Sequence, residues 1–277
     1  MAISLKQAQI DTFAETGFLV VEGMLDKADV EAARSRFEPL FAGEFETGLR
    51  PDEWNWRADA SPADHTRQIC NAWKSDLTLR RIVTREDIGQ ACAELRGWPG
   101  ARINQDNVIW KPPGARALGF HQDDSYQDWI LPNEMMTCWI ALDDTRANQG
   151  TIEYVPGSHV WPLSDPIERF HAPEDPAVEL RAAARNAGHE DFETLAIEVP
   201  AGSCVLHHGR TWHGSRNNHG PAPRRALVAH CMSSEARFHP RNVSPIYSRY
   251  KRQGSEEMDE SFFPILWRQD GYRTSWL

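Results

Sequence analysis

The sequence predicts a mainly β protein with flanking helices, folded as a sandwich or a closed barrel. Short apolar stretches separated by Pro/Gly turns follow one another between residues 102 and 232. Helical periodicity is concentrated in the first hundred residues. No internal repeat or linker divides the 277 residues. We therefore expect one domain over residues 1–277, with helical support over about 1–100, a β core over about 101–232 and a C-terminal tail over 233–277.

The N-terminal part carries the helical patterns. Apolar residues at helical spacing predict helices over residues 5–16, 26–41 and 76–97. Gly17 is a stop signal for the first helix, and Asp26 is a side-chain cap for the second. The polar segment between the second and third helices is rich in Asp, Glu, Pro and Trp, so we expect a loop there.

The predicted strands are short and bounded by turn residues. Strands are expected over residues 18–21, 136–142, 152–157, 195–199, 203–206 and 225–232. Residues 160–195 are polar and Pro-rich, with a helical stretch around 177–187, and are typical of an insertion; a loop of this length could form a lid. The tail ends in aromatic residues, which we expect to pack back on the domain.

Composition limits the class of protein. The formal net charge of -10 argues against nucleic acid or an anionic membrane as the partner. The five cysteines form no CxxC pair, which is typical of reduced, buried thiols. The N-terminus lacks a signal-peptide pattern, and no apolar run is long enough to cross a bilayer. We expect a cytoplasmic monomer or homodimer.

The first candidate ligands of a metal are His121 and Asp123. In a strand, residues two apart project to the same side, so these two side chains can reach one ion while Gln122 points away. Asp124 is the rival carboxylate, but it faces the other way. The tripeptide His121-Gln122-Asp123 alone is weak evidence for a metal site, because such sequences also occur in surface turns.

A second histidine is available about ninety residues later. His207, His208 and His213 are all candidates, and His213 is preferred because the Gly-Ser turn after it permits close backbone approach. Two histidines and one carboxylate form the ligand set of non-haem Fe(II) oxygenases. Zinc accepts the same ligands, although the HExxH motif is absent.

An iron site of this kind that uses an α-keto acid also needs a cation for the distal carboxylate of that acid. An arginine fork suits a carboxylate best. Arg224 and Arg225 follow His213 on or near the next predicted strand. One of the two is expected to be a solvent-exposed charge.

Several motifs in order resemble the phytanoyl-CoA dioxygenase family of Fe(II)/2-oxoglutarate oxygenases. The resemblance covers roughly residues 8–232. The matching motifs are Gly17-Phe18-Leu19-Val20-Val21, Lys111-Pro112-Pro113-Gly114, His121-Gln122-Asp123, Trp139-Ile140-Ala141-Leu142-Asp143-Asp144, Gly150 with Val155-Pro156-Gly157-Ser158-His159, and His213-Gly214-Ser215 with Arg224.

The resemblance implies a double-stranded β-helix, a cupin-like jelly roll with helices packed on one side. It implies that three residues hold Fe(II), namely His121, Asp123 and His213. It also implies four contacts to the co-substrate 2-oxoglutarate, namely Arg224, Ser215, Trp139 and Asn107. O2 is the third reactant. The carboxylate of Asp123 argues against a halogenase, because halogenases of this superfamily have a small residue in place of this carboxylate ligand.

The implied reaction is oxidation of a small molecule, most simply hydroxylation, with release of succinate and CO2. Desaturation, epimerisation, ring closure and demethylation are compatible with the same site, and a non-catalytic cupin-like metal- or ligand-binding protein is the alternative from another class. An acyl-CoA would require a cluster of cations that the acidic chain does not display. The candidate substrate contacts, chosen for their closeness to the ligands in sequence, are Tyr126, Trp129, Trp161, Arg210 and Trp212.

Overall fold

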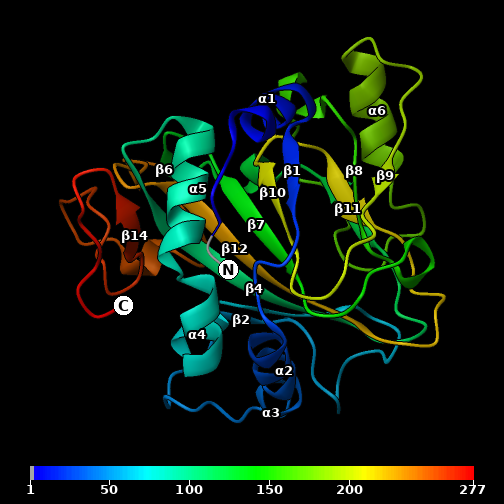
Figure 1. Ribbon diagram of the computed structural model, residues 1–277, viewed down its shortest axis with the longest axis horizontal. Helices are drawn as coiled ribbons and strands as arrows, with labels where there is room; N and C mark the ends of the chain where they lie inside the picture. Colours follow the sequence, from blue (N-terminus) through cyan, green and yellow to red (C-terminus); the bar gives the residue numbers. More distant parts are fainter. Residues whose placement is uncertain (1–2) are drawn as a thin grey trace.

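A large antiparallel sheet dominates the computed structural model, which describes residues 3–277 (Figure 1). Its eight strands follow the order β1-β10-β7-β12-β4-β3-β2, with β14 beside β4. Their bounds are β1 Phe18–Val21, β2 Glu53–Trp54, β3 Arg67–Cys70, β4 Gly100–Lys111, β7 Met136–Ala141, β10 Cys204–His208, β12 Arg224–Ser233 and β14 Ile265–Arg268.

A second, smaller sheet has the order β5-β11-β8-β9, and a two-stranded ribbon pairs β13 with β6. The bounds are β5 Leu118–His121, β6 Ile130–Leu131, β8 Ile152–Tyr154, β9 Leu195–Ala196, β11 His213–Ser215 and β13 Arg237–Phe238. From β4 to β12 the chain passes repeatedly from one of the two larger sheets to the other, as in a jelly roll. The predicted double-stranded β-helix is confirmed.

Helices support the larger sheet from one side. Figure 1 shows α4 and α5 lying across it, whereas α6 lies beside the smaller sheet. The α-helices are α1 Gln7–Thr16, α2 Lys27–Ser35, α3 Phe37–Phe41, α4 Leu77–Val83, α5 Glu86–Arg96 and α6 Val178–Asn186, and the 3-10 turns are η1 Ala72–Lys74, η2 Asp123–Tyr126, η3 Ala147–Gln149, η4 Ser158–Val160 and η5 Ser248–Tyr250. No helix of residues 3–277 combines the length and the apolar character that crossing a membrane requires.

Two of the three expected N-terminal helices are each divided in two. The predicted helix over 26–41 is interrupted at Arg36, and the one over 76–97 is interrupted at Thr84 and Arg85. The side chains of Asp26 and Asp76 each cap the helix that follows, accepting a backbone N–H three residues on. The apolar faces of these helices join the outer face of the sheet in one core that extends from Ile3 to Leu266.

Segments that were expected to be loop or tail are built into the sheets. Part of the polar segment after α3 forms β2, which pairs with β3. The C-terminal tail returns to the domain, where β14 pairs with β4. Aromatic residues of the tail, including Phe238, Tyr247 and Phe263, pack against Trp129.

Candidate metal centre and co-substrate site

Three ligand atoms converge between the two sheets. His121 is the last residue of β5 and lies opposite His213, the first residue of β11. Asp123 follows β5 in the turn η2. The Oδ1 atom of Asp123 lies 3.5 Å from Nε2 of His121 and 3.6 Å from Nε2 of His213. The ligand atoms of the three buried residues all lie within 4.8 Å of one another.

Both histidines are oriented by the backbone. Nδ1 of His121 lies 2.9 Å from the carbonyl oxygen of Gly119, and Nδ1 of His213 lies 2.9 Å from that of Thr211. Each Nδ1 therefore donates a hydrogen bond, which leaves the lone pair of Nε2 facing Asp123. Burial, followed by the proximity of His121, lowers the pKa of His213 well below its ordinary value. The neutral imidazole is the form that binds a metal.

The second oxygen of the Asp123 carboxylate is held by the protein. Oδ2 accepts a hydrogen bond of 2.7 Å from the hydroxyl of Thr137 and lies 3.1 Å from Nε2 of His207. Thr137 in turn lies 2.8 Å from Nδ1 of His230, whose Nε2 lies 2.9 Å from the amide nitrogen of Asn107. This series of hydrogen bonds keeps Oδ2 occupied, so that only Oδ1 faces the two histidines.

A buried pocket for an anion lies beside this centre. Nε and Nη2 of Arg224 donate to the carbonyl oxygen of Gly150 at 3.1 and 2.8 Å, while the buried Nη1 has no hydrogen-bond partner among the described residues. Burial lowers the pKa of Arg224 to about 10, so the group stays charged at neutral pH. A buried guanidinium with an unpaired N–H fits a carboxylate ligand.

Lys111 adds a second buried nitrogen donor next to Arg224, which it faces across the paired strands β4 and β12. Its Nζ donates to the hydroxyl of Ser215 at 2.8 Å. Within residues 3–277 neither Lys111 nor Arg224 forms an ion pair with a carboxylate. Arg225 differs, because its half-buried guanidinium binds both oxygens of Asp143. Arg224, not Arg225, is thus the arginine available to a ligand.

The metal centre and the anion pocket open into one cavity of about 760 Å³. Trp139, whose ring centroid lies 5.8 Å from the Arg224 guanidinium carbon, forms part of its wall with Ser215 and Asn107. Tyr126 and Trp129 also line it. All seven residues implied as metal and co-substrate contacts therefore surround the same space.

Three expected substrate contacts lie elsewhere. Arg210 donates to the backbone oxygen of Trp161 at 2.7 Å, and neither side chain belongs to the cavity wall. Trp161 stacks on His189. Trp212 is fully buried beside Phe120 in a separate apolar cluster. For Trp212 the reason is alternation, because a residue adjacent to a ligand in sequence points to the opposite side of the strand. Arg210 lies in the turn after β10, and Trp161 follows the turn η4, so neither has a strand position that would aim it at the cavity.

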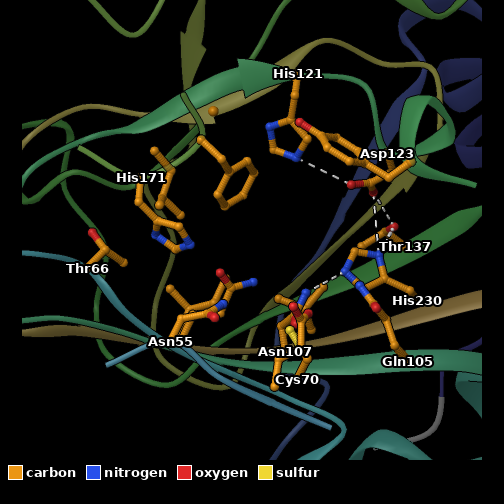
Figure 2. A pocket seen from close by; sticks show the side chains of 18 of the residues that line it. Asn55, Thr66, Cys70, Gln105, Asn107, His121, Asp123, Thr137, His171 and His230 are labelled. Atoms are coloured by element: carbon orange, nitrogen blue, oxygen red, sulfur yellow. Dashed lines mark hydrogen bonds and ion pairs between the residues drawn. The ribbon is translucent and has the colours of Figure 1, made fainter. Parts of the chain in front are cut away.

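The outer wall of the cavity comes from parts of the chain that sequence reasoning did not assign to the site. These are residues 53–70 and 244–247, with Phe170 and His171 from the predicted lid. In Figure 2, Asn55, Thr66 and His171 lie across the cavity from Asp123. Alternation from Asn107 along β4 could have predicted Gln105, whereas nothing in the local sequence connects the tail with the site.

A jelly roll that encloses two histidines, one carboxylate and a buried arginine defines the class of Fe(II)- and 2-oxoglutarate-dependent oxygenases. The sequence matches the phytanoyl-CoA dioxygenase (PhyH) family over residues 13–226. The chain belongs to this family, and it is a 2-oxoglutarate-dependent dioxygenase whose cofactor is Fe(II).

Individual relatives are distant. The phytanoyl-CoA dioxygenase domain-containing protein 1 of Bos taurus is 26% identical over 273 residues, covering 83% of this chain and 91% of that protein. Ectoine dioxygenase of Halomonas elongata is 28% identical over 235 residues, covering 79% and 68%. The carbocyclase SnoK from nogalamycin biosynthesis superposes with a TM-score of 0.73 at 23% identity, covering 95% and 96% of the two chains.

Proposed function

We propose that His121, Asp123 and His213 hold Fe(II), that Arg224 and Ser215 bind the distal carboxylate of 2-oxoglutarate, and that the enzyme hydroxylates a small molecule. When bound, Fe(II) and 2-oxoglutarate supply O2 activation, with release of succinate and CO2 and transfer of one oxygen atom to the substrate. The observation that carries the proposal is the buried, unpaired Nη1 of Arg224 in the cavity that also contains the metal ligands.

The remaining residues position the reactants. In this proposal Trp139 and Asn107 flank 2-oxoglutarate, and Tyr126 and Trp129 contact the substrate. The carboxylate of Asp123 binds through Oδ1, because Thr137 and His207 occupy Oδ2. The apolar wall near Arg224 limits the entry of water, so the ion pair with the co-substrate forms at low local dielectric.

We further propose that residues 1–277 work as a single oxygenase domain, as a monomer or homodimer in the cytoplasm, on neither nucleic acid nor a membrane. The shared core from the N-terminal helices to β14 and the acidic net charge support this proposal.

Spectroscopy tests the metal assignment. Anaerobic addition of Fe(II) and 2-oxoglutarate should produce a weak visible charge-transfer band that His121→Ala and Asp123→Ala abolish. A protein without the band and without succinate formation would instead be a cupin-like binding protein.

Steady-state kinetics test the anchor. Arg224→Ala should raise the KM for 2-oxoglutarate by about a hundredfold, since a charge-assisted bond to a buried carboxylate contributes roughly 1.5–3 kcal/mol and its loss leaves that charge unpaired. Arg225→Ala is the matched control, because Arg225 pairs with Asp143 outside the cavity. Equal effects of the two substitutions would contradict the assignment.

A further inference from the structure

The lining of the cavity outside the anion pocket is polar but carries almost no charge. Five side-chain amides face it, namely those of Asn55, Gln68, Gln105, Asn107 and Gln127. Hydroxyl groups of Ser61, Thr66 and Ser244 add to them. Among the described residues of the wall, Arg224 is the only lysine or arginine. Once that arginine binds 2-oxoglutarate, the wall has no strong cation left for the substrate.

Some of these amides lack partners in the protein. Gln68 is 6% exposed, and its side chain forms no hydrogen bond with another residue of 3–277. The oxygen of Gln105 accepts from Tyr247, while its NH2 group has no partner within the same residues. A buried amide that is not paired costs free energy unless a ligand or water satisfies it. Gln68 and Gln105 therefore present donors and acceptors to a bound molecule.

Regular strand geometry places these groups together. Gln68 and Cys70 lie on one face of β3, and Gln105 and Asn107 lie on the same face of β4. Asn107 is the register partner of Cys70. The amides of Gln68, Gln105 and Asn107 are thus fixed on the sheet rather than on loops, as expected of a preformed recognition surface.

The other titratable groups of the wall disfavour an anionic ligand as well. Burial lowers the pKa of His171 to about 4, so its imidazole is neutral at physiological pH. Burial, followed by the proximity of Glu53, raises the pKa of the Cys70 thiol well above its ordinary value. Glu53 is the one carboxylate in the wall besides Asp123, and it forms no ion pair among residues 3–277. A carboxylate accepts hydrogen bonds from hydroxyl groups and repels anions.

We propose that the substrate of this dioxygenase is a neutral molecule rich in hydroxyl or amide groups, a polyol or glycoside in chemical class, and that Gln68 and Gln105 select it. The inference rests on the proposed function of the same site. A cavity of about 760 Å³ holds a ligand of ordinary small-molecule size together with 2-oxoglutarate. Aromatic side chains of Tyr126 and Phe170 supply an apolar face beside the polar groups.

A matched panel tests the proposal. Neutral methyl glycosides and cyclic polyols are compared with the corresponding uronic acids, phosphate esters and amino sugars, with succinate release above the substrate-free rate as the readout. Stimulation by neutral members, with little from their charged counterparts, is the expected result. Stimulation confined to acids, phosphates or amines would overturn the proposal, and so would a neutral set that never stimulates.

Charge substitutions at Gln68 give a second readout. Gln68→Ala should raise the KM for the best neutral compound about tenfold and leave the KM for 2-oxoglutarate unchanged. Gln68→Lys should shift the preference toward the acidic counterpart, and Gln68→Glu should shift it away. Identical preferences in all three variants would refute the role of Gln68.

The charge-transfer band with Fe(II) and 2-oxoglutarate distinguishes a failure of the proposed function from a failure of the proposed substrate class. If the band forms while the panel ranks charged compounds first, the proposed function stands and the substrate class is wrong. If the band is absent in the wild-type protein, the proposed function itself fails.

Discussion

A single hydroxyl connects Asp123, a proposed metal ligand, with the lining of the cavity. Thr137 donates to Oδ2 of Asp123 and contacts His230, which in turn contacts Asn107. Groups that orient a metal ligand typically contribute ten- to hundredfold to metal affinity. Thr137→Val should therefore weaken Fe(II) binding by about that factor, as measured by anaerobic metal titration.

Thr145→Val is a suitable control for this substitution. Thr145 is equally buried, but its hydroxyl donates to the carbonyl oxygen of Ile197. We expect it to lower the free energy of unfolding and leave Fe(II) affinity unchanged, whereas Thr137→Ser should retain most of the affinity. If Thr137→Val binds Fe(II) as the wild type does, the hydrogen bond to Asp123 has no positioning role.

Lys111 orients the hydroxyl of Ser215. Because Lys111 donates to Oγ of Ser215, the Ser215 proton is left to point toward the co-substrate. Burial, followed by the neighbouring Arg224, lowers the pKa of Lys111 well below its ordinary value. Lys111→Met should raise the KM for 2-oxoglutarate about tenfold with little change in kcat.

The double variant with Ser215→Ala checks this interpretation. Since both residues act through one hydroxyl, we expect the combined effect on the KM to be close to that of either single change. Effects that multiply would mean that Lys111 and Ser215 act independently.

The residues nearest the metal were the most predictable part of the site. His121, Asp123 and His213 could be chosen from spacing and residue type, and ordered motifs indicated Arg224 in preference to Arg225. Arg210 and Trp161 could not be excluded, because closeness in sequence does not determine the side to which a side chain points. Gln68 and Gln105 have no distinguishing local pattern, and only the pairing of β3 with β4 places them in the cavity.

At the level of elements, the connection between β7 and β8 supports the anion pocket through Gly150. Its carbonyl oxygen receives both donors of Arg224, and its φ of 62° lies in the left-handed region. A Cβ atom there would lie 2.5 Å from the Arg216 oxygen and 2.8 Å from Cδ of Lys111. Gly150→Ala should therefore displace Arg224 and Lys111 and raise the KM for 2-oxoglutarate at least tenfold.

Gly114→Ala separates backbone strain from close approach. Gly114 has a φ of 80°, but a Cβ atom there meets nothing within 4 Å. We expect a loss of about 1 kcal/mol in the free energy of unfolding and a normal KM for 2-oxoglutarate. A comparable rise in KM for Gly114→Ala would show that backbone strain alone produces the effect.

Elements with strong periodicity were predicted well, but the breaks within the predicted helices were not. The strands at 136–142 and 225–232 match β7 and β12 within a residue. The helix over 26–41 was expected to be continuous. Instead α2 ends at Ser35 and α3 begins at Phe37, so the single residue Arg36 divides it. Strand β2 has only two residues and exists because β3 offers it a partner, which is information that a local pattern does not contain.

Over the whole molecule, the tail completes the cavity by long-range polar contacts. Lys74 donates to Asp52 at 2.7 Å and to the hydroxyl of Tyr250 at 3.1 Å, and Tyr247 donates to Gln105. These bonds fix residues 244–250 against β4 and the segment before β2. The tail lies beyond residues 13–226, the part that matches the family model, so this wall of the cavity is built from residues outside the family motifs.

Binding of 2-oxoglutarate is expected to raise the free energy of unfolding of the whole domain. Arg224 and Lys111 are buried in the sheet without a carboxylate partner among residues 3–277, so the dianion 2-oxoglutarate binds the folded state and not the unfolded chain. At a hundred times its Kd, such a ligand adds about 2.7 kcal/mol to the free energy of unfolding. For a domain of this size that corresponds to a rise in Tm on the order of 5–10 °C. Anaerobic thermal unfolding with Fe(II), with and without 2-oxoglutarate, measures it. Arg224→Ala should lose the rise while Arg225→Ala keeps it, and a rise that survives in Arg224→Ala would locate the binding of the co-substrate elsewhere.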